Sequence, residues 1–344
     1  MNELAELIRR EIRKDGVISF HRFMEMALYE PGLGYYETHR DIGRSGDFYT
    51  SVSVGKLFGE LLGFQFARWL EPLEGEVQLL EAGAHDGQLA RDILDYLRDW
   101  QPEIVERTTL ILLEPSRIHR QWQAETLASH EAKVKWHRAE PEPFRGIFYC
   151  NELLDACPVE KYEWDKQNRT WFEWGVGLKN GKFEWRRMGD DCWSCEFSDQ
   201  LPDGTGMVEA PQASHIWYSV CGALKEGRAV AIDYFIEREE YFNPPTPNAT
   251  LRAYHQHRAS DDLLARVGEQ DLTASVSLYE IRAAGLEGEK ISPQEKFLIN
   301  VFEQTLQHPA QFPEWTSGRM RQFNTLTHPD HLGRAFKVLE KWRR

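Results

Sequence analysis

The sequence predicts an α/β fold, a mostly parallel β-sheet with helices on both faces, together with a helical N-terminal segment and a β-rich insertion. The first observation is a short apolar strand at 77–80 that runs through a glycine-bearing turn into a helix at 88–97. A strand, a glycine turn and a helix form the first unit of nucleotide-binding sheets. The second observation is a series of further apolar strands, at 109–113, 133–137, 146–150 and 228–235.

The composition limits the classes of partner. Of the 344 residues, 41% are hydrophobic and 28% are charged, which is typical of a globular protein with about two domains. The formal net charge is −14. Proteins that bind a phosphate backbone usually carry a basic face, so we expect no nucleic-acid partner. No apolar run approaches the roughly 20 residues that span a bilayer, so we expect no membrane insertion.

The N-terminal residues are amphipathic but include Glu3, Glu6 and Glu11. Transit peptides avoid acidic residues and signal peptides need an apolar core, so we expect a cytoplasmic protein. The five cysteines are scattered and odd in number, which is no disulfide framework. Cys192 and Cys195 form a C-x-x-C without a second pair at zinc spacing, so we predict no metal site.

The glycine turn indicates which ligand it suits. Glu81 stands at the carboxyl end of the strand, where its charge would repel a pyrophosphate. Gly83 and Gly87 form G-x-x-x-G rather than the dinucleotide pattern G-x-G-x-x-G. S-adenosylmethionine carries a positive sulfonium and an amine but no phosphate, so an acidic turn suits it. The alternative is an ordinary buried turn between a strand and a helix.

Polar residues follow two further strands. Glu114 ends the second strand, where a Rossmann-like fold meets the ribose hydroxyls, and one carboxylate can accept both hydroxyl protons. The alternative is a charged strand end without a ligand. The fourth strand runs into Asn151, Glu152 and Asp155. Because ligands bind at the carboxyl ends of parallel strands, these three residues are the candidate reaction centre.

Two other segments have marked compositions. Residues 34–51 are polar, rich in glycine and interspersed with aromatics, which favours a ligand-facing loop over a plain connector. In residues 159–208 aromatic and polar residues alternate, and Asn180-Gly181 is a type I′ hairpin signal. Packing is the default role of these aromatics.

The domain organisation follows from these segments. We expect an N-terminal helical and cofactor-loop segment at 1–70, a Rossmann-like core at 71–158 and 211–344, and a β-rich insertion at 159–210 that acts as a lid or substrate wall. Further helices are expected at 2–14, 57–70, 211–226, about 276–284, 296–306 and 332–342.

Seven segments taken in order resemble the MidA-type S-adenosylmethionine-dependent methyltransferases, whose mitochondrial members methylate an arginine of a respiratory complex I subunit during its assembly. The resemblance covers about residues 17–340 and rests on G-Y-Y…I-G-R-S-G-D-F-Y-T-S…L-F-G-E (34–60), L-L-E-A-G-A-H-D-G-Q-L-A-R-D-I-L (79–94), N-E-L-L-D-A-C-P-V (151–159), A-I-D-Y (231–234), T-L-R-A-Y-H-Q-H (250–257), D-L-T-A-S-V (271–276) and F-K-V-L (336–339).

The resemblance implies a class I methyltransferase core, S-adenosylmethionine as cofactor and a methyl acceptor that includes protein arginine as a candidate. The residues expected at the cofactor are Gly46, Asp47, Phe48, Thr50, Glu81, Gly83, Asp86, Gly87 and Glu114. One departure is notable: the family turn usually reads E-x-G-P-G-x-G, but here Ala84 replaces the proline and His85 the middle glycine. Histidine adopts a positive φ less readily than glycine.

The expected reaction is in-line displacement of the methyl group, with positioning and electrostatics supplied by the protein. A second hypothesis is a weakly catalytic assembly factor that binds a partner protein through the aromatic-rich residues 162–185. A small-molecule O- or N-methyltransferase is a further alternative. The acidic strand end and the missing dinucleotide pattern argue against an oxidoreductase. The sequence leaves open the methyl acceptor, the effect of His85 and the oligomeric state, including a homodimer.

Overall fold

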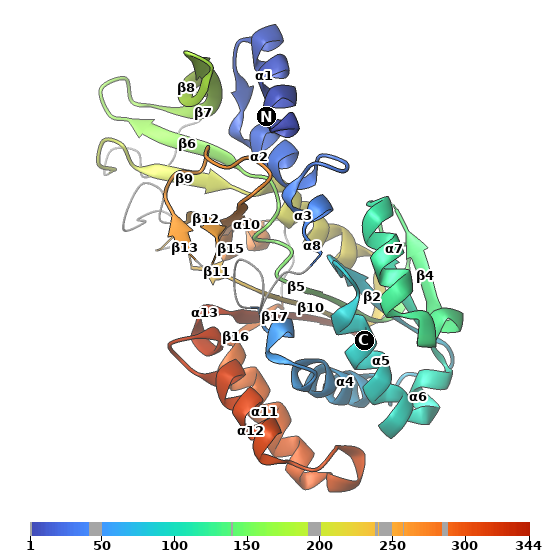
Figure 1. Ribbon diagram of the computed structural model, residues 1–344. Coiled ribbons are helices and arrows are strands. Elements are labelled where there is room, and N and C mark those ends of the chain that lie inside the picture. Colours follow the sequence, from blue (N-terminus) through green and yellow to red (C-terminus); the bar gives the residue numbers. More distant parts are fainter. Residues whose placement is uncertain are drawn as a thin grey trace. The chain divides into compact units, whose positions relative to one another are not determined.

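The computed structural model describes residues 2–40, 50–138, 140–191, 201–237, 240, 250–256, 258–283 and 288–344 (Figure 1). The chain divides into two compact units. The first comprises Met1–His39, Leu154–His215 and Phe235–Ala284. The second comprises Arg40–Leu153, Ile216–Tyr234 and Gly285–Arg344. The chain therefore passes between the units several times, and one passage lies directly after the fourth predicted strand.

The second unit is built on a seven-stranded sheet in the order β16-β17-β10-β5-β2-β3-β4. Its strands are β2 (Val77–Ala82), β3 (Thr108–Leu113), β4 (Val134–His137), β5 (Phe144–Asn151), β10 (Leu224–Asp233), β16 (Lys290–Pro293) and β17 (Lys337–Arg343). The neighbours from β10 to β4 are parallel, whereas β17 runs antiparallel to both β10 and β16. The predicted α/β class with a mostly parallel sheet is confirmed.

Helices of the second unit form an apolar core with this sheet. They are α4 (Leu57–Leu70), α5 (Gln88–Trp100), α6 (Pro102–Glu106), α7 (Arg117–Thr126), α11 (Gln294–Gln307), α12 (Ser317–Thr327) and α13 (Leu332–Ala335). Side chains of α4, α5, α11 and α12 pack together in one cluster with Leu79, Ile147 and Val230 of the central strands. Figure 1 shows α4, α11 and α12 side by side. Burial on both faces explains why the central strands are almost continuously apolar.

The predicted helix at 332–342 is wrong over most of its length. Only α13 is helical, and β17 follows as a strand. The three consecutive residues Val338, Leu339 and Glu340 are all buried, so both faces of β17 are covered, and the strand pairs with β10 on one side and β16 on the other. Long-range pairing thus decided the structure of a segment whose local apolar spacing also fitted a helix.

The first unit combines short helices with small sheets. Its helices are α1 (Glu3–Asp15), α2 (Phe20–Tyr29), α3 (Tyr35–Thr38) and α10 (Leu278–Ala283), while α8 (Pro211–Ala223) continues into the second unit. The largest sheet joins β1 (Ile18–Ser19), β7 (Thr170–Lys179), β6 (Glu160–Asp165) and β9 (Gly206–Glu209), with β8 (Lys182–Asp191) on β7. Smaller sheets contain β11 (Phe235–Ile236), β12 (Leu251–His255), β13 (Arg258–Ser260), β14 (Asp271–Ala274) and β15 (Val276–Ser277).

The β-rich segment has the predicted local structure. Asn180 and Gly181 join β7 to β8 and both have positive φ, 52° and 74°, as a type I′ turn requires. Trp164 and Trp171 are buried, and their ring centroids lie 5.6 Å apart. These two tryptophans therefore pack within the unit's own core, which was their default role. No helix of the described residues is long and apolar enough to cross a membrane.

Candidate functional site

The turn between β2 and α5 concentrates unusual backbone angles. Gly83, His85 and Gly87 have φ values of 71°, 47° and 85°. A Cβ atom added to Gly83 would lie 2.9 Å from Cδ1 and 3.1 Å from Cβ of Leu153, so a side chain here would force Leu153 to shift. The left-handed conformation costs a non-glycine residue about 1–2 kcal/mol, and His85 carries that cost. The turn therefore keeps its backbone bare at both glycines.

Glu81 lies at the end of β2, just before this turn. Its side chain is 3% exposed, and the Tyr149 hydroxyl donates a hydrogen bond of 2.9 Å to its Oε2. Burial raises the pKa of Glu81 to about 8, although the bond from Tyr149 opposes the shift. A nearby cation would favour the ionised form of such a carboxyl group. A cationic ligand at this position would therefore stabilise the ionised form of Glu81.

The ring of His85 is held against α7 and against Arg40, which lies within the predicted ligand-facing segment 34–51. Its Nε2 lies 2.9 Å from the carbonyl oxygen of Arg40, which can only accept, so Nε2 carries the proton. Desolvation lowers the pKa of His85 and favours the neutral ring. The ring centroid lies 5.2 Å from that of His119 and 5.6 Å from that of Trp122.

Glu114 lies immediately after β3 and is 4% exposed. The backbone N–H of Ser116 donates to its Oε1 at 2.9 Å, and the side-chain amide of Gln123 donates to its Oε2 at 3.0 Å. Nδ1 of His119 lies 3.3 Å from the same Oε2. The carboxylate is thus held in one orientation by three groups from the start and middle of α7.

The third cluster lies at the end of β5. Glu152 has φ +52°, and its N–H donates to the carbonyl of Ile232 at 2.9 Å. Its Oε1 accepts bonds from the backbone N–H of Ser51 at 3.3 Å and from Nδ2 of Asn151 at 2.9 Å. Within the described part of the chain, Oδ1 of Asn151 is buried without a hydrogen-bond partner. An acceptor of this kind suits an N–H donor from a ligand.

Asp155 belongs to the first unit, although it lies three residues after Glu152. It is 5% exposed, and its carbonyl accepts a bond of 2.8 Å from the N–H of Ala274. The carbonyl of the next residue, Ala156, accepts from the Tyr29 hydroxyl at 2.8 Å. The next element after Asp155 is the strand β6, so its side chain caps no helix.

The residues predicted to bind the cofactor lie in different parts of the chain. Glu81, Gly83, Asp86, Gly87 and Glu114 lie at the carboxyl ends of β2 and β3 in the second unit. Asp86 accepts a bond from the N–H of Gln88 at the start of α5. Thr50 is in the same unit and bonds locally with Ser53. Gly46, Asp47 and Phe48 lie outside the described residues.

Three partners of these residues had no sequence signal: Tyr149, His119 and Gln123. Tyr149 lies within an apolar strand, where an aromatic residue normally packs. Gln123 lies on a helix of ordinary amphipathic pattern. Their roles depend on contacts with residues that are distant in sequence, which periodicity cannot report.

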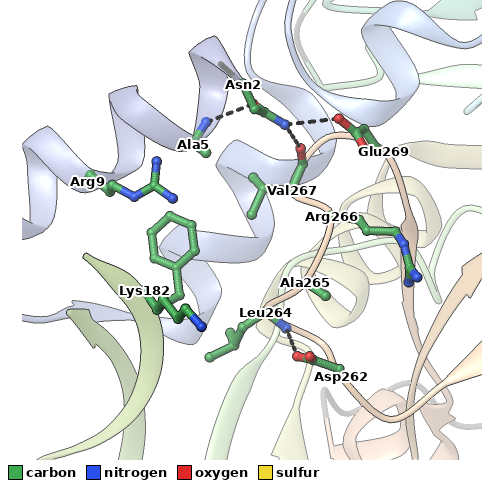
Figure 2. Close-up of a pocket in the computed structure, with 11 residues that line it drawn as sticks. Asn2, Ala5, Arg9, Lys182, Asp262, Leu264, Ala265, Arg266, Val267 and Glu269 are labelled. Atoms are coloured by element: carbon green, nitrogen blue, oxygen red, sulfur yellow. Dashed lines mark hydrogen bonds between the residues drawn. The ribbon is translucent and has the colours of Figure 1, made fainter. Parts of the chain in front are cut away.

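Figure 2 shows a pocket of about 430 Å³ in the first unit. It lies between the start of α1, the start of β8 and residues 262–269. The guanidinium of Arg9 lies 5.1 Å from the ring centroid of Phe183, and Asn2 bonds to the carbonyl of Val267. The described residues that line this pocket include none of the predicted site residues, so it is separate from the three clusters above.

Comparisons with known proteins agree on one family. The profile of a family described as "Putative S-adenosyl-L-methionine-dependent methyltransferase" matches residues 61–295. "Protein arginine methyltransferase NDUFAF7, mitochondrial" from Mus musculus is 27% identical over 97% of this chain and 84% of its own length. The protein of the same name from Danio rerio is 26% identical over 94% of this chain and 82% of its own length.

A solved structure from Burkholderia thailandensis has the same architecture. It is described as a methyltransferase candidate bound to S-adenosyl-homocysteine. It is 28% identical to this chain, with a TM-score of 0.83 over 99% of this chain and 92% of its own.

The expected cytoplasmic location is contradicted by the relatives, because the names of those from mouse, zebrafish and human all include the word mitochondrial. The expectation rested on three glutamates near the N-terminus. Such residues describe only the first segment of this sequence and carry no information about where its relatives act.

Proposed function

Because the chain belongs to the MidA-type family of S-adenosylmethionine-dependent methyltransferases, we propose that it methylates a guanidinium nitrogen of arginine in a protein substrate. The enzyme class and the cofactor follow from the family; the acceptor is the proposal. The names of the relatives support it. The observation that carries it is the carboxylate of Glu152 at the end of β5, beside the buried acceptor Oδ1 of Asn151.

The residues around the glycine turn suit the cofactor. S-adenosylmethionine supplies an electrophilic methyl group on a sulfonium. The bare backbone at Gly83 and Gly87 allows close approach, and the buried Glu81 can become negative beside a cation. We assign Asp86 and Glu114 to the same site, with Glu114 at the ribose. Gly46, Asp47, Phe48 and Thr50 complete the proposed cofactor set.

The acceptor chemistry requires a carboxylate. A guanidinium has a pKa above about 12 and is a poor nucleophile until it loses a proton and its lone pair is localised. Glu152 can pair with the guanidinium and accept that proton. Asn151 can accept a guanidinium N–H through Oδ1 and so orient the nucleophile. Asp155 is the second candidate base, and binding of the cofactor's amine is the alternative role of Glu152.

The β-rich residues 159–210 are proposed as a lid or substrate wall, which suits a protein-sized acceptor. The alternative of a weakly catalytic assembly factor rested on the aromatics of residues 162–185. Trp164 and Trp171 are buried in the unit's own core, so they offer that alternative no docking surface.

The test uses purified protein, labelled S-adenosylmethionine and a cell extract, followed by mass spectrometry of the labelled products. Methylated arginine in a small set of proteins is the expected result. Label on lysine, on small molecules or on nothing would overturn the arginine assignment. Calorimetry with S-adenosylhomocysteine and with NAD serves as the control for the cofactor, and we expect micromolar binding of the first alone.

A further inference from the structure

We infer that Gln123 is a positioning residue of the cofactor site, because its side-chain amide joins the glycine turn to Glu114. The inference rests on the proposed role of Glu114 at the ribose. Gln123 lies in α7 and is fully buried. A buried glutamine must satisfy two N–H donors and a carbonyl acceptor, and the partners that it chooses show what it holds together.

The amide of Gln123 bonds to three separate segments. Nε2 donates to the carbonyl of His85 at 3.0 Å and to Oε2 of Glu114 at 3.0 Å. Oε1 accepts from the indole Nε1 of Trp136 at 2.9 Å. The orientation of the amide is unambiguous, because an indole N–H can only donate and a carbonyl can only accept. The turn after β2, the end of β3 and β4 are thus tied to one side chain.

The hydrogen bond from Gln123 to Glu114 limits which carboxylate oxygen can bind a ligand. A carboxylate has about four acceptor positions. Ser116 uses one on Oε1, while His119 and Gln123 share Oε2. The acceptor position that remains is on Oε1, and it can accept a hydrogen bond from one ribose hydroxyl. Gln123 therefore turns Oε2 toward the protein and leaves Oε1 for the cofactor.

Packing places the glycine turn directly on this helix. A Cβ atom added to Gly87 would lie 3.4 Å from Cα of Gln123, so the turn and α7 are in contact at this residue. Satisfied buried polar networks are rigid, and rigid support keeps binding groups at their productive spacing. Loss of the amide would let the turn and the carboxylate move independently.

The test compares Gln123→Met with Gln121→Met. Methionine has a similar volume but cannot donate either hydrogen bond. Gln121 lies two residues earlier on α7 and bonds only to Glu125 among the described residues, which makes it a matched control. Calorimetry measures binding of S-adenosylhomocysteine and of its 2′-deoxy and 3′-deoxy analogues, and circular dichroism follows the unfolding temperature.

We expect the natural protein and Gln121→Met to discriminate against one deoxy analogue by about tenfold, the effect of one lost hydrogen bond. Gln123→Met should weaken the binding of S-adenosylhomocysteine by at least about tenfold and should reduce the discrimination against the deoxy analogue to less than about threefold. A merely structural residue would change the unfolding temperature but leave the discrimination intact. If Gln123→Met does not fold, Gln123→Glu keeps the acceptor for Trp136 and should show the same loss.

Glu114→Gln separates this inference from the proposed function. If it loses discrimination while Gln123→Met retains both affinity and discrimination, the role of Gln123 is wrong and the ribose assignment stands. If Glu114→Gln binds and discriminates as the natural protein does, the ribose assignment is wrong, and the inference falls with it.

Discussion

The two candidate clusters differ in how the chain holds them. The cluster at the ends of β2 and β3 lies wholly in the second unit, and its acids are fixed by buried partners such as Tyr149 and Gln123. The cluster after β5 is divided. Glu152 is anchored to Ser51 and Ile232 of the second unit, whereas the backbone of Asp155 is anchored to Ala274 of the first.

We expect this difference to separate substitutions that affect binding from those that affect chemistry. A cofactor site within one unit can be organised before any ligand arrives, because its hydrogen bonds do not depend on the other unit. The three residues of the candidate reaction centre lie within five positions of the chain but belong to two units. Substitutions in the first cluster should therefore change affinity, and those in the second should change turnover.

The largest effect is expected for Gly83→Val. The valine side chain would overlap Leu153 and fill space that the cofactor needs, so S-adenosylhomocysteine should bind at least about a hundredfold more weakly. Gly75→Val is the control, because Gly75 has nearly the same φ, 72°, with no heavy atom within 4 Å of the added Cβ. Both variants carry the strain of about 1–2 kcal/mol, but only the first should lose binding. Calorimetry that finds comparable affinities would remove Gly83 from the site.

The positions of the residues in the first cluster could largely be predicted from the sequence. Its residues follow strands of strong apolar pattern, and Gly83 and Gly87 have positive φ where the turn needs it. The side chains that hold these residues in place, such as Gln123, could not be predicted. Gln123 is 38 residues from His85 and 9 from Glu114, and such pairings arise only when the sheet has formed.

The division of the second cluster was also invisible in the sequence. Nothing in the letters N-E-L-L-D indicates that the chain passes to another unit after Leu153. The prediction of a helix at 332–342 was wrong for a related reason: β17 is a strand because it pairs with β10 and β16, which lie far away in the chain. The local sequence pattern thus predicted most helices and strands, while long-range contacts determined which side chains hold the site residues in place.

A second prediction concerns pH and Glu81. Its pKa is raised from 4.5 to about 8, chiefly by burial, so the folded state binds a proton that the unfolded state releases. The contribution to stability is fully present below about pH 4.5 and is lost as the pH rises through about 8. The ligand-free protein should therefore lose on the order of 3 kcal/mol more than Glu81→Gln between pH 5 and pH 9. Urea unfolding at both pH values measures this difference.

Tyr149→Phe sharpens the same comparison. The Tyr149 hydroxyl donates to the Glu81 carboxyl group and lowers its pKa, so its removal should shift the loss of stability to higher pH. Parallel pH profiles of the natural protein and Glu81→Gln would show that Glu81 ionises without penalty in the folded state.

A third prediction tests the second cluster with two isosteric changes. Glu152→Gln should reduce methyl transfer by about a hundredfold, the scale of general-base loss, while affinity for S-adenosylhomocysteine changes by less than threefold. Asp155→Asn serves as the paired variant and should have the smaller effect. Labelled transfer to the identified acceptor measures turnover, and calorimetry measures affinity. A larger loss in Asp155→Asn would place the base in the first unit, and a loss of affinity in Glu152→Gln would assign Glu152 to the cofactor's amine.

The smallest effect is expected for His85→Gly, which restores the residue that the family usually has at this position. Glycine relieves the positive φ of 47° but loses the bond from Nε2 to the Arg40 carbonyl and the contacts with His119 and Trp122. Relief of about 1–2 kcal/mol is offset by one hydrogen bond, by ring packing and by the greater entropy of glycine when unfolded.

The net change for His85→Gly should be a destabilisation of about 1 kcal/mol. Its affinity for S-adenosylhomocysteine should stay within about threefold of the natural value, because Gln123 bonds to the backbone carbonyl of residue 85 and not to its side chain. His85→Ala is the matched variant: it loses the same contacts and keeps the strain, so it should be the less stable of the two by about 1 kcal/mol. Urea unfolding separates them. Equal stability would mean that the strain at residue 85 is no larger than the entropic cost of ordering a glycine. A large loss of affinity in both variants would mean that the imidazole itself belongs to the cofactor site.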